Sequence, residues 1–362
     1  MQPHPLIELS NRQEVRQAKG FKDVAAALSG GELAELYQGE LANAPKRAAV
    51  GKKFLVKMKP PSARRAHRDE EHLSLALLKY CRDSNAALDL PHLGSLHLLA
   101  SQVPLATASA DRSAGDSDPN KGVGKIDLLG VGPGDRLVVG KLKFLEPQAT
   151  RGGSGDTPLR ALLDGLAHTA IASANRESLS SELAGPIGRA LSEEPPLLFL
   201  LATPRYWELC RKREAQRGAA WIREMERLAH DAEERIGVQV MYLAIALEGD
   251  PGWVYGEEGP VLVTAPRLTA AWEARAGVVK PKARPRARAQ TGAVEKVVEA
   301  DLSRPIRTYL VTESYSAGDR ISHPTLGTGV VQGSVGAGKI RVFFDGKKAL
   351  LVHQRPAPGS PT

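Results

Sequence analysis

Cysteine and aromatic residues are both scarce in this chain. Cys81 and Cys210 are its only cysteines, and each lies in an apolar pattern typical of a helix. We therefore expect two reduced, packed thiols, with neither a disulfide framework nor a cysteine-based zinc motif. Aromatic residues make up 5% of the sequence, and none lies among its clustered cations. This composition argues against a surface that stacks on single-stranded bases.

Long apolar runs are also missing. Nowhere do about 18 uninterrupted apolar residues follow one another, as a membrane-spanning helix requires. The first twenty residues lack the basic start and apolar core of a signal peptide. The sequence therefore predicts a cytoplasmic protein with no membrane partner.

What the chain does contain is enough apolar sequence for a sizeable core, together with an excess of positive charge. Apolar residues account for 42% of its 362 residues, and the formal net charge is +8. A chain of this length accommodates one large domain and a small second one. The charge permits contact with phosphate groups or with an acidic partner.

Alternating helix and strand patterns predict an α/β (α+β) domain over residues 63–274. Residues 69–82 have the period of a largely buried helix, with His72 on a narrow polar strip. Residues 125–131 and 136–145 alternate as two strands around a Gly-Pro-Gly-Asp turn. A helix from Thr157, a buried strand after Pro196, a long helix over 206–236 and a strand over 238–247 follow. Residues 1–62 are expected to form a helical or irregular extension.

A basic, Pro- and Ala-rich linker is predicted over residues 275–312. Because its cations are clustered without acids between them, they are candidate nucleic-acid contacts, with DNA favoured as the ligand. A solubilising spacer is the alternative interpretation. The five candidate residues are Lys280, Lys282, Arg284, Arg286 and Arg288.

The most suggestive chemical pattern is an aspartate in one strand and a lysine in the next, preceded by acids at the start of a helix. Asp127 and Lys143 are the strand residues, and Glu70 and Glu71 open the helix. This order resembles that of PD-(D/E)XK nucleases over roughly residues 65–250. The resemblance implies a restriction-endonuclease-like core, in which a mixed sheet is flanked by helices. It also implies Mg²⁺ or Mn²⁺ on Asp127 and Glu70, with Lys143 positioning the attacking water.

One position departs from the family pattern. The second acid of the motif corresponds to residue 141, which is Lys here and shares a strand face with Lys143. A cation beside the metal position opposes binding by several kcal/mol and removes one ligand. Glu146 is expected on the opposite face, and Asp164 is expected in solvent opposite a leucine stripe, so neither replaces the acid well. The Lys141–Lys143 face is instead a candidate phosphate site, or merely a solvated strand edge.

The C-terminal segment, residues 313–356, is predicted to form a small β-barrel. Four short β-patterned pieces, RISH, GVVQG, KIRVFF and KALLVH, are separated by Gly-rich turns. Their spacing resembles the Tudor-like (SH3-like) barrel of UvrD/PcrA-type helicases and of the CarD family. That resemblance implies a partner such as RNA polymerase or a repair protein. His323 and His353 are interpreted as turn or packing residues, and Gly333 to Lys339 as no phosphate loop, because a strand follows.

Three functions remain open at this point. The first is a nuclease-fold protein that binds nucleic acid but is catalytically impaired at the standard metal site. The second is an active divalent-metal-dependent endo- or exonuclease that hydrolyses phosphodiesters, using Asp127, Lys143 and Glu70 or Glu71 with Lys141 tolerated. The third is a non-enzymatic adaptor in transcription or repair. If the protein is not an active nuclease, no cofactor is expected.

Overall fold

The computed structural model describes residues 4–57, 60–108, 118–150, 155–212, 220–272, 297–335, 338–345 and 347–354. It divides the chain into two compact units, Met1–Ala274 and Arg275–Thr362. The basic residues 280–288 of the predicted linker lie outside the described residues. Within the described part of the chain, no helix combines the length and apolar character needed to cross a membrane.

The first unit is built on a mixed sheet that has seven strands among the described residues, in the order β1-β2-β3-β4-β5-β6-β9. Strands β1 to β4 pair antiparallel, β4, β5 and β6 pair parallel, and β9 is antiparallel to β6. The strand bounds are β1 Leu88–Leu90, β2 Gly94–Pro104, β3 Lys125–Val131, β4 Leu137–Lys143, β5 Leu197–Ala202, β6 Gln239–Ala246 and β9 Arg267–Ala270. The predicted α/β class is confirmed at this level.

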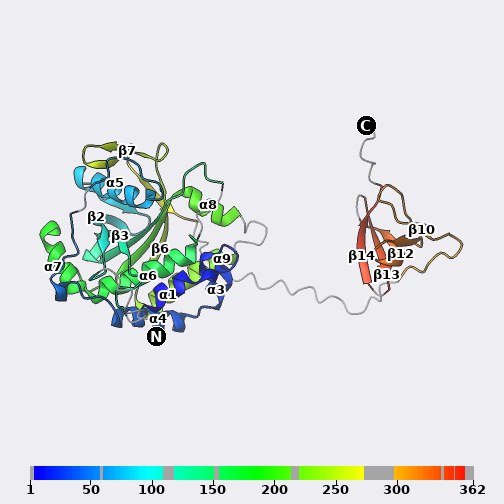
Figure 1. Ribbon diagram of the computed structural model, residues 1–362, viewed down its shortest axis with the longest axis horizontal. Coiled ribbons are helices and arrows are strands. Elements are labelled where there is room, and N and C mark those ends of the chain that lie inside the picture. Colours follow the sequence, from blue (N-terminus) through cyan, green and yellow to red (C-terminus); the bar gives the residue numbers. More distant parts are fainter. Residues whose placement is uncertain are drawn as a thin grey trace. The chain divides into compact units, whose positions relative to one another are not determined.

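Helices cover both faces of this sheet (Figure 1). One face carries α5 (Asp69–Asp83) and the hairpin of β7 (Trp253–Gly256) and β8 (Gly259–Leu262). Packed on the other face are α6 (Pro158–Ala174) and α9 (Ala220–Ile236). All six residues of β5 are buried because this central strand is covered on both sides.

The N-terminal helices belong to the same compact unit. They are α1 (Pro5–Asn11), α2 (Gln13–Arg16), α3 (Phe21–Ala27) and α4 (Gly30–Ala42), followed by the 3₁₀ turn η1 (Ala48–Val50). Ser29 and Glu32 form a reciprocal capping box that starts α4. Apolar side chains of all four N-terminal helices join the core beneath α6 and α9. These helices therefore enclose α6 on the side that faces away from the sheet.

Two details differ from the sequence-based expectations. His72 is buried rather than on a polar strip, and it forms a hydrogen bond with the Tyr255 hydroxyl. In place of the one helix expected over 206–236, the structure has α8 (Pro204–Lys212) and α9, and residues 213–219 are outside the described part. The tight turn predicted between β3 and β4 is present and contains the short 3₁₀ segment η3 (Pro133–Asp135). A further helix, α7 (Arg176–Ile187), follows α6. Cys81 is buried, Cys210 is half-buried, and neither takes part in a disulfide.

The second unit is a sheet that has five strands among the described residues, in the order β10-β11-β12-β13-β14. The four predicted strands correspond to β11 (Arg320–His323), β12 (Gly327–Ser334), β13 (Lys339–Phe344) and β14 (Lys347–Val352). An additional strand, β10 (Arg307–Thr308), pairs parallel to β11, and Val298 exchanges hydrogen bonds with the Gln332 side chain. Part of the predicted linker is therefore packed against the sheet.

Candidate functional site

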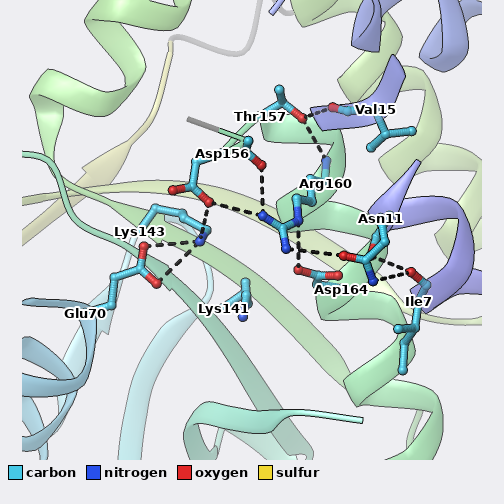
Figure 2. A network of polar contacts seen from close by, with 12 residues as sticks. Ile7, Asn11, Val15, Glu70, Lys141, Lys143, Asp156, Thr157, Arg160 and Asp164 are labelled. Atoms are coloured by element: carbon cyan, nitrogen blue, oxygen red, sulfur yellow. Dashed lines mark hydrogen bonds and ion pairs between the residues drawn. The ribbon is translucent and has the colours of Figure 1, made fainter. Parts of the chain in front are cut away.

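A cluster of charged side chains lies where strand β4 ends (Figure 2). Asp127 comes from β3, Lys141 and Lys143 come from the paired strand β4, and Glu70 comes from the first turn of α5. Alternation along β4 directs Val138 and Leu142 into the core beneath α5, whereas Val139 packs toward α6. The two lysines share the side of Val139, as the sequence predicted. The structure therefore brings together the strand residues of the proposed motif.

Lys141 is ion-paired with Asp127. Its Nζ lies 3.2 Å from Oδ2 of Asp127, and the backbone amide of Leu142 donates a 3.0 Å hydrogen bond to the same oxygen. Burial alone raises the pKa of the Asp127 carboxyl. The ammonium group of Lys141 and the Leu142 amide outweigh that effect, so the pKa is lower than its usual value. Asp127 is therefore an ionised carboxylate whose counter-ion belongs to the protein.

Lys143 is held by two other carboxylates. Its Nζ lies 3.1 Å from Oε1 of Glu70 and 2.9 Å from Oδ1 of Asp156. Burial lowers the pKa of Lys143, but the two carboxylates outweigh burial and raise the pKa above its usual value. Burial also raises the pKa of Glu70, although Lys143 acts in the opposite direction. The ammonium group of Lys143 therefore stays protonated at neutral pH.

The first turn of α6 forms the next part of the network. The Thr157 side chain caps this helix by accepting a 3.2 Å hydrogen bond from the Arg160 amide, and its hydroxyl donates to the Val15 carbonyl. The Arg160 guanidinium donates to the Gly155 carbonyl and reaches Asn11 on α1 (Figure 2). Contacts with Val15 and Asn11 thus connect the N-terminal helices to the site.

Asp164 does not occupy the solvated position that its helical phase suggested. Its side chain is 20% exposed, and its Oδ2 lies 3.9 Å from Nε of Arg160. Figure 2 shows it directed toward the same network. The expectation failed because the N-terminal helices cover the outer side of α6, which the leucine stripe alone does not reveal.

Two side chains at the cluster each have a buried polar atom that makes no hydrogen bond with any described residue. Among the described residues, neither the Tyr206 hydroxyl nor Nε of Arg160 has a hydrogen-bond partner. Tyr206 lies at the start of α8, where the Thr203 amide donates to the Lys143 carbonyl. Burial raises the pKa of its hydroxyl well above the usual value, and the charges of Asp156 and Glu70 act in the same direction. Both atoms are donors that an acceptor, such as an ordered water, would satisfy.

His168 is a further member of the cluster that the sequence did not indicate. It is buried on α6, and its pKa is lowered to about 4, first by burial and then by the charge of Lys141. The imidazole is therefore neutral at pH 7. Asp156, Arg160 and Tyr206 were likewise missed. Only Asp156 carried a local signal, because an acid directly before a Thr-Pro helix start lies beside the positive end of that helix.

Two acids considered from the sequence, Glu71 as a site residue and Glu146 as a replacement acid, contact arginines rather than either lysine. Glu71 pairs with Arg68 at 3.4 Å rather than with either lysine. Glu146 lies beyond the end of β4 and pairs with Arg64. Of the two helix glutamates considered, only Glu70 thus reaches the lysines. The lysines do not form a solvated strand edge either, because β4 lies between β3 and β5.

The residues present do not fit the expected divalent metal. Asp127 and Glu70, the proposed ligands, each contact a different lysine, and the Lys141 ammonium lies against the carboxylate that a metal would need. Over the described ranges, no group of three His, Cys, Asp or Glu side chains has the arrangement of a metal site. The lysines also present no free cationic face for phosphate, because carboxylates neutralise both of them.

Comparison with known proteins did not place this chain in a family. No family model, curated protein or solved structure matched it. The chemistry of the cluster and of the basic linker is therefore the basis for assigning a function.

Proposed function

We propose that this chain is a nucleic-acid-binding protein with a restriction-endonuclease-like core that does not catalyse metal-dependent hydrolysis. The observation that carries the proposal is the 3.2 Å ion pair between Lys141 and Asp127. It provides a protein cation where a PD-(D/E)XK nuclease would bind its metal. Two other functional groups of such a site, Glu70 and Lys143, are bound to each other.

The pairing also limits what Lys143 does chemically. A lysine that activates water must release its proton near neutral pH. Here Glu70 and Asp156 raise the pKa of Lys143, so the amine form is scarce. The cluster thus lacks both an accessible metal position and a competent base. Its physical role is to hold α5 and the segment before α6 to the carboxyl end of β4.

In this proposal the phosphate contacts come from the linker. Lys280, Lys282, Arg284, Arg286 and Arg288 supply five cations within nine residues. If each displaces one condensed counter-ion from duplex DNA, the logarithm of the association constant falls with the logarithm of salt concentration with a slope of about −4 to −5. Such binding is independent of base sequence.

The absence of nuclease activity is tested by cleavage assays on single- and double-stranded DNA and RNA with Mg²⁺ or Mn²⁺. We expect no cleavage by the wild type. Cleavage that disappears in Asp127→Ala would overturn the proposal. Lys141→Glu tests whether the site is otherwise intact, because it restores an acid at the second motif position. Its fold is checked by tryptophan fluorescence, since Trp207, Trp221, Trp253 and Trp272 all lie in the first unit.

Nucleic-acid binding is tested with a variant whose five linker cations are replaced by Gln. We expect it to lose most of its affinity for a DNA duplex and most of the salt dependence. A matched control carries the same loss of charge on exposed residues of the first unit: Arg12, Arg16, Lys19, Lys125 and Arg267. Equal losses in the two variants would show that only net charge matters and would refute the role of the linker.

The second unit favours an additional role as an adaptor. Its strand β14 exposes Leu350 (60%) and Val352 (40%), which is the kind of apolar surface that protein partners cover. We propose that this unit is a Tudor-like barrel that binds RNA polymerase or a repair protein. Co-purification with the full chain should be lost in Leu350→Asp and retained in Leu302→Asp, whose side chain is also exposed. Equal retention in both variants would reject β14 as the contact.

A further inference from the structure

The segment that connects α4 to α5 is strongly basic and contains no acid. Residues 43–68 include nine Lys or Arg residues and no Asp or Glu, although 41 of the 362 residues of the chain are acids. All of this connector except residues 58 and 59 is described. Because α4 and α5 belong to opposite sides of the sheet, the connector passes around its edge (Figure 1). Positive charge is thus concentrated on a folded segment of the first unit, separate from the linker.

Buried contacts hold the middle of the connector in place. Phe54 is fully buried in the core, and its amide donates 3.0 Å hydrogen bonds to the Glu182 carboxylate on α7. The amide of Leu55 donates to the same carboxylate at 2.8 Å. The Arg47 guanidinium donates to the Lys53 carbonyl at 2.6 Å. The backbone is therefore fixed before any partner binds, which lowers the entropy cost of using its cations for binding.

Three cations of the connector are exposed and have no acidic partner in the described part of the chain. They are Lys53, Lys57 and Arg65. Arg68 is also exposed, and it pairs with Glu71 at 3.4 Å. An exposed pair of this kind contributes less than about 1 kcal/mol, so a phosphate group could replace the glutamate at little cost. The other described cations of the connector already bind protein groups: Lys46, Arg47 and Lys52 bind carbonyl oxygens, and Arg64 binds two acids.

Two acids share a hollow with Lys57, but they do not reverse its charge. Glu258 pairs with Lys79 at 3.7 Å and with Arg82 at 3.4 Å, and Glu257 lines the same hollow. The described lining therefore contains three cations and two acids. An approaching phosphate group meets a net positive surface there as well.

The side chains of the connector distinguish between anionic partners. Its only Phe, Tyr or Trp residue is the buried Phe54, so no aromatic ring is available to stack on single-stranded bases. Val50 and Val56 are exposed, but neither lies on an amphipathic α-helix of the kind that binds membrane surfaces. Two of the three unpaired cations are lysines, which are depleted in protein–protein interfaces. The phosphate backbone of a duplex is the anion that fits these properties.

We propose that the connector binds the phosphate backbone of duplex DNA through Lys53, Lys57 and Arg65. The inference rests on the proposed nucleic-acid-binding function, and it adds a contact on the folded core to the contact made by the linker. Three phosphate contacts should add about −2.7 to the slope of the logarithm of the association constant against the logarithm of salt concentration. Because these contacts are to phosphates, they should not depend on base sequence.

The test measures the binding of the full chain to a fluorescent DNA duplex by anisotropy at several salt concentrations. The connector variant carries Lys53→Gln, Lys57→Gln and Arg65→Gln, and it is made with the linker intact and with the five linker cations replaced by Gln. In both backgrounds we expect the slope to become less steep by about 2.7 and the affinity at low salt to fall at least about tenfold. The three side chains are exposed, so the variant should keep the wild-type tryptophan emission.

A matched control removes three other exposed cations of the first unit, by Lys19→Gln, Arg223→Gln and Arg267→Gln. The control should keep the affinity and the slope of the wild type. If the wild type binds DNA but the connector variant binds equally well, or if the control loses as much affinity as the connector variant, the inference is overturned and the nucleic-acid-binding function stands. Failure of the wild type to bind DNA at low salt would overturn both. Binding to phosphatidylserine vesicles but not to DNA would overturn both in favour of a membrane surface.

Discussion

Replacing Lys141 with Met tests the energetic role attributed to its ion pair with Asp127. The substitution keeps much of the side-chain volume but removes the charge that lies 3.2 Å from Oδ2 of Asp127. At that separation, two unit charges attract by about 5 kcal/mol in a medium with an effective dielectric constant of about 20. Removing one member of a buried pair costs about 3–5 kcal/mol, because the other is left without its counter-ion.

The lower end of that range applies here. Asp127 keeps the hydrogen bond from the Leu142 amide, so its carboxylate is not wholly unsatisfied in the variant. We expect the free energy of unfolding of Lys141→Met to fall by about 3 kcal/mol at pH 7. Urea unfolding followed by tryptophan fluorescence measures this change, since all four tryptophans are in the first unit. The slope of the free energy of unfolding against urea concentration should be the same in the variant and the wild type.

The loss should depend on pH. In the wild type the folded pKa of Asp127 is lowered, so its stabilising effect is present above the unfolded value of 3.8 and is lost as pH falls through the folded pKa. In Lys141→Met the burial effect dominates and raises the folded pKa. The variant is then stabilised by protonation as pH falls. The difference in stability between the two proteins should therefore narrow from pH 7 to pH 4.

A double variant provides the control for this reasoning. Asp127→Asn with Lys141→Met removes both charges, and the Asn carbonyl oxygen still accepts from Leu142. It should recover most of the lost stability, because replacing a whole buried pair is close to neutral. The free energy of unfolding of Lys141→Met could instead fall by less than about 1 kcal/mol, by the same amount from pH 4 to pH 7. That result would refute the idea that Lys141 compensates the buried charge of Asp127.

Three further predictions concern other buried groups. Burial lowers the pKa of His4, but the hydrogen bonds to Glu40 and to the Pro119 carbonyl outweigh burial and raise the pKa above 6.5. The stability that the His4–Glu40 pair contributes is therefore present below pH 6.5 and is lost as pH rises through the folded pKa of His4. Urea titrations should show a larger deficit for His4→Gln at pH 6 than at pH 8.5, and a constant deficit would contradict the pairing. Tyr206→Phe removes a buried hydroxyl without a described partner, so the free energy of unfolding measured by thermal unfolding should rise by about 1 kcal/mol. A lower free energy of unfolding would show that an ordered water binds the hydroxyl. Gly140→Ala places a Cβ 2.3 Å from the Phe199 ring, so the free energy of unfolding in urea should fall by about 1–3 kcal/mol. An unchanged free energy would mean that the ring shifts to make room at no cost.

Local periodicity was sufficient to predict the elements that position the site. The helix expected over 69–82 is Asp69–Asp83 in the structure, and the alternation in β4 placed Lys141 and Lys143 on one face. These features depend on neighbouring residues, which a 3.6- or two-residue period reports directly. The departure at position 141 was also visible in the sequence, because it concerns residue type and strand phase alone.

The partners of the lysines could not be predicted in the same way. Asp156 lies 13 residues from Lys143, and Glu70 lies 73 residues from it, so their contacts depend on how α5 and α6 pack at the end of β4. Asp164 was assigned to solvent because the sequence did not reveal that the N-terminal helices cover α6. His72 was assigned to a polar strip because the covering hairpin of β7 and β8 lies about 180 residues later in the chain. Long-range packing, rather than propensity, decided each of these positions.

In the proposed nucleic-acid-binding function, the charge balance of the cluster disfavours phosphate contacts at this part of the core. Three carboxylates, Glu70, Asp127 and Asp156, face the two ammonium groups of Lys141 and Lys143, so this part of the cluster carries a net negative charge. A phosphate group that bound either lysine would have to displace a carboxylate that is already ion-paired with it, and the loss of that ion pair would offset the gain. The five linker cations have no acid between them in the sequence and face no such competition. Substituting Lys141 or Lys143 should therefore change the stability of the core far more than its affinity for DNA, whereas substitutions in the linker should do the reverse.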